Sequence, residues 1–94
     1  MGFFFSSPED KYPIERQVIS DIELKQAVSR FSSPELSTDQ ENLIEQALLS
    51  KKHEHNGKLS QRDVYKILHH FKLQKKISEN DLQQVMKELA ERLT

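Results

Sequence analysis

Two short stretches decide the fold of this chain: residues 59–64 read LSQRDV and residues 77–82 read ISENDL. In each stretch a Ser is followed three residues later by an Asp, and apolar residues stand directly before the Ser and four residues after it. In such a box the Ser hydroxyl accepts a helix N–H, the acid reaches back to the cap, and the apolar pair packs together. Both stretches therefore predict the first turn of a helix.

The residues that follow each box have the period of an amphipathic helix. Apolar residues recur at positions 64, 67, 68 and 71 after the first box, and at positions 82, 85, 86 and 89 after the second. This spacing places them on one face of a helix with 3.6 residues per turn. We therefore predict helices at 61–72 and 79–93.

Two further helices are predicted upstream of these boxes. Ser20 and Glu23 form another capping box ahead of an apolar stripe, which predicts a helix at 21–31. A cluster of Ser, Thr and Asp provides caps for a helix at 39–51. Pro13 suits a first helical turn, because the N–H that it lacks would be unpaired there, so a short fifth helix at 13–19 is an option.

The expected fold class is all-α, a compact bundle of four main helices. The 94 residues are enough for one domain, which we expect to span 13–94 after a loose N-terminal arm at 1–12. The predicted core consists of the stripe residues Leu24, Val28, Phe31, Leu43, Ile44, Ala47, Leu48, Val64, Ile67, Leu68, Phe71, Leu82, Val85, Met86, Leu89 and Leu93.

Composition excludes several classes of protein. The chain has no Cys, which rules out disulfides, cysteine-based zinc sites and thiol catalysis. It has no run of about 20 apolar residues, so we expect no membrane span, and a cytoplasmic protein. Nucleophile-elbow, phosphate-loop and zinc-protease motifs are missing. We therefore expect no enzyme, no catalytic residues and no cofactor.

The segment between the second and third predicted helices, residues 52–63, reads KHEHNGKLSQRD. With Gly57 at the sixth position of a twelve-residue loop, Leu59 falls at the eighth. Residues 39–72 therefore resemble a degenerate EF-hand helix–loop–helix, which implies an apolar bridge residue at that eighth position. An ordinary Asn-Gly turn before a capped helix is the alternative interpretation.

The calcium ligands of that family are not matched here. Lys52 stands where the first carboxylate is needed, and the short Asp63 replaces the bidentate Glu at the twelfth position. The four His, at positions 53, 55, 69 and 70, contain no pair at the helical spacing of a metal site. We therefore expect no metal site.

Charge is concentrated in residues 51–76, which hold eight basic and two acidic side chains, whereas residues 1–50 hold four basic and nine acidic ones. We interpret the segment as a basic face that is either simply solvated or a docking surface for an acidic partner. Its residues are Lys51, Lys52, Lys58, Arg62, Lys66, Lys72, Lys75 and Lys76. The alternative is a nucleic-acid-binding protein that uses 51–76. The net acidic charge of the predicted helix 79–93 disfavours it.

Five apolar side chains are not used by the core pattern and are candidates for partner binding: Phe3, Phe4, Phe5, Ile22 and Leu49. On helical wheels, Ile22 and Leu49 fall far from the stripes of their own helices. The alternative interpretation is that the five side chains are scattered, or that the N-terminal arm folds back over the others. The expected function is a small, non-catalytic protein-interaction or adaptor module. Its partner would be another protein or a second copy of this chain, and nucleic acid is disfavoured.

The EF-hand resemblance makes a direct prediction about calcium. Millimolar calcium should leave the melting temperature and the amide NMR spectrum unchanged, because the ammonium group of Lys52 opposes a cation in the loop. A stabilisation that grows with calcium concentration and disappears in Asp63→Ala would contradict this expectation.

Overall fold

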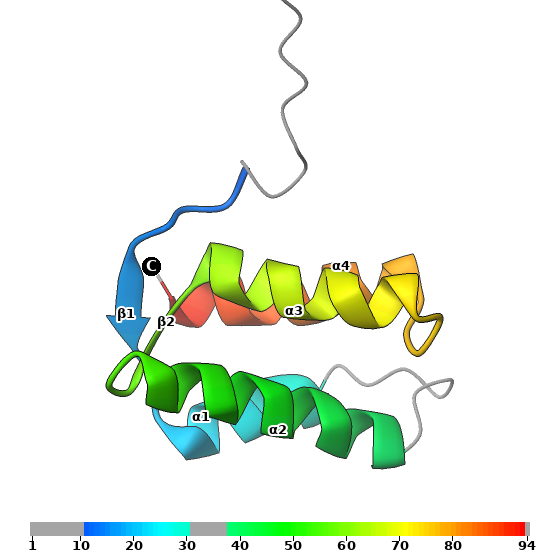
Figure 1. Cartoon of the computed structure of the whole chain (residues 1–94), viewed down its shortest axis with the longest axis horizontal. Helices are drawn as coiled ribbons and strands as arrows, with labels where there is room; N and C mark the ends of the chain where they lie inside the picture. Colours follow the sequence, from blue (N-terminus) through cyan, green and yellow to red (C-terminus); the bar gives the residue numbers. More distant parts are fainter. Residues whose placement is uncertain (1–10, 31–37, 94) are drawn as a thin grey trace, which may run out of the picture.

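The computed structural model describes residues 11–30 and 38–93, and it has the all-α fold that the sequence predicts. Four helices form the bundle, and two three-residue strands lie at one end of it (Figure 1). In chain order the elements are β1 (Arg16–Val18), α1 (Asp21–Arg30), α2 (Thr38–Glu54), β2 (Lys58–Ser60), α3 (Gln61–Leu73) and α4 (Glu79–Arg92).

The helices form two layers, with α1 beside α2 in one layer and α3 beside α4 in the other (Figure 1). Contacts between the layers run from α1 to α4 and from α2 to α3, so each helix packs against two neighbours. At one end of the bundle β1 pairs antiparallel with β2, and Gln17 lies opposite Leu59. This ladder joins the start of the described chain to the segment between α2 and α3.

Both capping boxes are formed. The Ser60 hydroxyl accepts the Asp63 N–H at 2.9 Å, and the Asp63 carboxylate accepts the Ser60 N–H at 3.1 Å. Ser78 and Asp81 exchange the same two hydrogen bonds, each at 3.1 Å. Each box satisfies N–H groups that a helix start leaves without partners. The predicted helix starts at 61 and 79 are therefore confirmed.

The short helix considered at 13–19 is wrong, because residues 16–18 form strand β1 instead. Its backbone groups pair with β2, which lies more than forty residues further along the chain. A local pattern cannot report such a partner, and Val18 is a β-branched residue that favours a strand once a partner strand is available.

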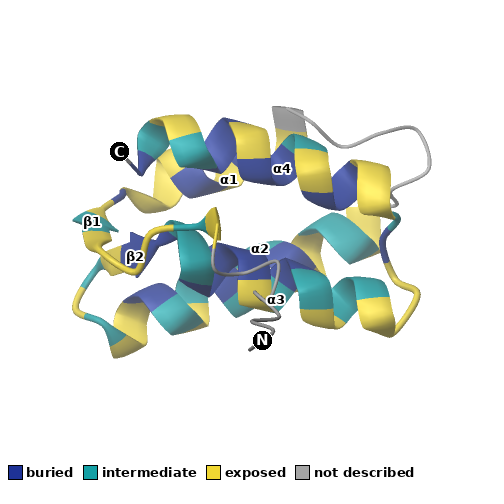
Figure 2. Cartoon of the chain, turned by 90° about the horizontal axis from the view of Figure 1, so that it is seen from above, coloured by how far each residue is buried: buried dark blue, intermediate teal, exposed yellow. Residues whose placement is uncertain are grey.

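Most of the predicted core is buried in the centre of the bundle (Figure 2). Leu43 is a correction, because its side chain is 46% exposed. Ala47, Ile67 and Phe71 are only half-buried, and Phe31 lies outside the described residues. The structure adds Ile19, Ala27, Leu59, Tyr65 and Ile77 to the buried set.

Within residues 11–30 and 38–93, no helix combines the length and the apolar character that crossing a membrane requires. The predicted arm overlaps the described residues only at Lys11 and Tyr12. Tyr12 is half-buried, and its ring stacks on Tyr65 of α3 with the two centroids 5.0 Å apart.

Two leucines test the packing of the bundle. Leu89→Ala should lower the free energy of unfolding by about 2–4 kcal/mol, because the side chain is fully buried and its loss leaves a cavity. The matched control Leu43→Ala should cost much less than Leu89→Ala, since nearly half of that residue is already exposed to water. Urea unfolding of both variants measures the difference. Equal losses would show that the inward face of α2 is misassigned.

Candidate functional site

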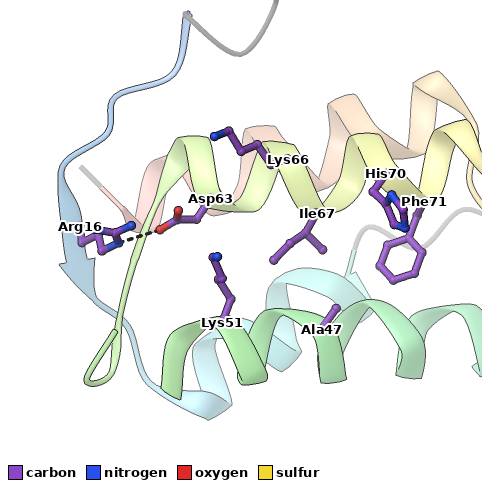
Figure 3. Close-up of a pocket in the computed structure, with 8 residues that line it drawn as sticks. All are labelled: Arg16, Ala47, Lys51, Asp63, Lys66, Ile67, His70 and Phe71. Atoms are coloured by element: carbon purple, nitrogen blue, oxygen red, sulfur yellow. Dashed lines mark hydrogen bonds and ion pairs between the residues drawn. The ribbon is translucent and has the colours of Figure 1, made fainter. Parts of the chain in front are cut away.

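A groove of about 390 Å³ runs between α2 and α3 and reaches β1 at one end (Figure 3). Ala47 and Lys51 contribute the α2 side, and Arg16 contributes the end at β1. The α3 side is formed by Asp63, Lys66, Ile67, His70 and Phe71. These five recur at intervals of three and four residues, so one face of α3 lines the whole groove.

The chemistry of the groove changes along its length. Arg16, Lys51 and Lys66 lie at the end near β1, whereas Ile67 and Ala47 face each other further along (Figure 3). Phe71 completes the apolar end, where the His70 ring lies beside it. One end of the groove is therefore cationic and the other is apolar, so the groove can hold a segment that carries both carboxylates and apolar side chains.

The cationic end is built around the carboxylate of Asp63. Arg16 Nε donates to Asp63 Oδ2 at 3.0 Å, and the Asp63 side chain is 11% exposed. Burial acts to raise the pKa of Asp63, but the hydrogen bonds from the Ser60 backbone and from Arg16 outweigh it and hold that pKa below its ordinary value. The carboxylate thus stays charged and fixes Arg16 at the mouth of the groove.

Lys52, near the end of α2, is only 8% exposed and pairs with Asp21 at the start of α1. Its carbonyl accepts the Gly57 N–H at 2.9 Å. Gly57 has a φ of +86°, a conformation that favours glycine. In the described part of the chain, no three His, Asp or Glu side chains lie close enough together to hold a metal ion.

The predicted basic residues do not gather on one face. Lys51 and Lys66 line the groove, Lys52 is buried, and Lys58 is exposed on β2. Arg62 Nε donates to the Tyr12 carbonyl at 3.1 Å.

The three remaining lysines lie around the connection from α3 to α4 and line a second hollow there. Lys72 pairs with Glu79 at 3.3 Å, and the Lys76 ammonium lies 5.9 Å from the centroid of the Phe71 ring. Lys75 has a φ of +61° in the turn. The basic segment is thus divided between the groove, the β2 end and this turn.

The predicted apolar partner residues also separate. Ile22 is 68% exposed on α1 and Leu49 is half-buried on α2, but neither lines the groove. Phe3, Phe4 and Phe5 lie outside the described residues. The sequence pattern assigned Ala47, Ile67 and Phe71 to the core, so it missed them as groove residues. The signal available was the small side chain of Ala47, which leaves space beside α3.

A pH titration tests the role of Asp63. Asp63→Asn should lower the free energy of unfolding at pH 7 by about 1–2 kcal/mol, because it removes a charge-assisted hydrogen bond to Arg16. The folded protein holds the pKa of Asp63 below its ordinary value of 3.8, so the wild type loses this stabilisation as the pH falls through the folded pKa. Urea unfolding between pH 7 and pH 2 should show that the difference in free energy of unfolding between the wild type and Asp63→Asn becomes smaller at low pH. A difference that stays constant would mean that the carboxylate charge plays no part.

No family model, curated protein or solved structure matches this chain. The lining of the groove combines three cations, the Asp63 carboxylate, the His70 ring and three apolar side chains.

Proposed function

We propose that this chain is a small, non-catalytic protein-interaction or adaptor module and that the groove between α2 and α3 is its docking surface. The observation that carries the proposal is the graded lining of the groove, cationic at Arg16, Lys51 and Lys66 and apolar at Ala47, Ile67 and Phe71. Apolar contacts supply affinity in such grooves, and opposite charges at the rim set orientation and specificity.

The size of the groove limits what it binds. Asp63 and Phe71 are separated by eight residues on α3, which is about 12 Å along the helix axis. A short segment of a partner covers that length, whereas a whole domain surface would need a larger contact area. The interaction is therefore of the transient, peptide-in-groove kind.

Two observations favour a protein partner over nucleic acid. Lys51, Lys52 and Lys72 are already paired with carboxylates of this chain, and the remaining cations are divided among separate places. Binding to a nucleic-acid backbone rests on several cations that contact successive phosphates. Nucleic-acid binding through 51–76 stays the alternative and is an arm of the test below.

The same proposal includes the EF-hand-like character of residues 39–72. It is supported by Gly57 at a positive φ and by Leu59 buried on β2, the sixth and eighth positions of the segment. The ammonium of Lys52, at the first position of the segment, pairs instead with Asp21 of α1. A cytoplasmic location is also part of the proposal and rests on the absence of Cys.

Selection of random displayed peptides on the full chain tests the docking surface. We expect enriched peptides that combine large apolar residues with Asp or Glu. Charge reversal of the rim, Lys51→Glu with Lys66→Glu, should weaken their binding by about tenfold or more, which corresponds to about 1.4 kcal/mol. The matched control Lys87→Glu reverses an exposed charge on α4, outside the groove, and should bind as the wild type does.

Two results would contradict the proposal. One is a selection that enriches no peptide, or only peptides that bind the double variant as well as the wild type. The other is tight binding of DNA or RNA at physiological salt that is lost in Lys75→Glu with Lys76→Glu, which would establish the nucleic-acid alternative.

A further inference from the structure

We propose that the groove has a ligand within this chain: the N-terminal segment, residues 1–10, docks into the groove of the same molecule and competes there with external partners. The inference rests on the proposed docking function of the groove and names the class of segment that the groove accepts. That class is a cluster of large apolar side chains joined to a pair of carboxylates.

The composition of the segment matches the lining of the groove. Residues 1–10 read MGFFFSSPED, with three consecutive Phe and, four residues after the last of them, Glu9 and Asp10. The aromatic side chains suit the apolar end at Ile67 and Phe71. The two carboxylates suit the cationic end, where Lys66 has no carboxylate partner among residues 11–30 and 38–93.

The order of the acidic and aromatic residues along the segment also matches the order of the cationic and apolar ends of the groove. The described chain passes the cationic end close to its start, because Ile14 lines a smaller hollow of about 280 Å³ that shares Arg16, Asp63 and Lys66 with the groove. The acidic pair directly precedes this start, whereas the three Phe lie further away along the chain. A segment that enters at the cationic end therefore presents its carboxylates first and its aromatic side chains at the apolar end.

Residues 1–10 are long enough to reach the apolar end of the groove. Tyr12 stacks on Tyr65. At 100° per residue, Tyr65 lies on the side of α3 that faces away from the groove, and Lys66 lies between that side and the groove side. The segment must therefore cross α3 at Lys66, where its carboxylates meet an exposed cation. From Asp10 to Phe4 the chain spans up to about 20 Å, more than the roughly 12 Å between Asp63 and Phe71 along α3.

Tethering makes weak contacts effective. A ligand joined by a short linker has an effective concentration in the millimolar range, so it occupies a site whose intrinsic affinity for the free peptide is low. A partner must displace the segment before it binds. Replacing all three Phe by Ser should therefore tighten the binding of an external peptide several-fold, because it removes the competitor.

A spin label provides a direct test, since the chain has no Cys and Ser6→Cys creates a unique attachment site. In the full chain, a nitroxide at position 6 should weaken the amide NMR signals of Ile67, His70 and Phe71 relative to the reduced label. The signal of Lys87 on α4 is the internal control. Lys51→Glu with Lys66→Glu should restore the groove signals, whereas Lys87→Glu should not.

A mixed sample separates contacts within one molecule from contacts between molecules. Spin-labelled chains without ¹⁵N are added to ¹⁵N chains without a label, so only contacts between two molecules weaken signals. We expect no effect in this sample. Weakened groove signals would identify a second copy as the occupant and overturn the proposal, as would unaffected groove signals in the directly labelled chain.

The two proposals fail in distinguishable ways. Displayed peptides that bind the groove while the label leaves it unaffected would remove the segment as a ligand and keep the docking function. The opposite result is a loss of groove signals that depends on Lys51 and Lys66, combined with a selection that enriches no peptide. The groove would then bind only the N-terminal segment of its own chain, and the proposed function would be wrong.

Discussion

The buried carboxylate of Asp63 is the constraint on which the polar end of this molecule depends. A buried carboxylate must be matched by donors, because burial without them costs several kcal/mol. Here the donors are the Ser60 N–H and the Arg16 guanidinium, so one side chain caps α3 and also holds β1. Two segments that lie 47 residues apart are thereby joined at the helix start. The β1–β2 ladder, the path of the chain before α1 and the cationic end of the groove all follow from that arrangement.

A second pair acts in parallel at the same end of the bundle. Lys52, near the end of α2, is paired with Asp21 at the start of α1, which holds the other layer of helices in place. The hydrogen bond from Lys52 lowers the pKa of Asp21, so the Asp21 carboxylate stays charged. With both layers held here, the groove opens between elements whose positions are already set. A ligand then loses little free energy to ordering the protein.

The helices could be predicted because their signals are local. A capping box and an apolar stripe involve residues within two turns of one another, so the starts of α3 and α4 are correct to the residue. The errors arise where a distant partner decides the outcome. Residues 16–18 form a strand because β2 is available to pair with them. Leu43 occupies a core position by its spacing yet is exposed, because no element described in the structure covers that side of α2.

The sequence by itself determined the all-α class, the helix starts and the identity of most buried residues, because helical period and caps are properties of neighbouring residues. Only the tertiary structure decided which basic side chains lie together around the groove. The basic segment looked like one surface, yet packing divides it, since successive residues of a helix point about 100° apart. The groove needed three separate segments, β1, α2 and α3, to come together. Neither charge count nor periodicity carries that information, because which helix faces pack together depends on contacts between residues that are far apart in the chain.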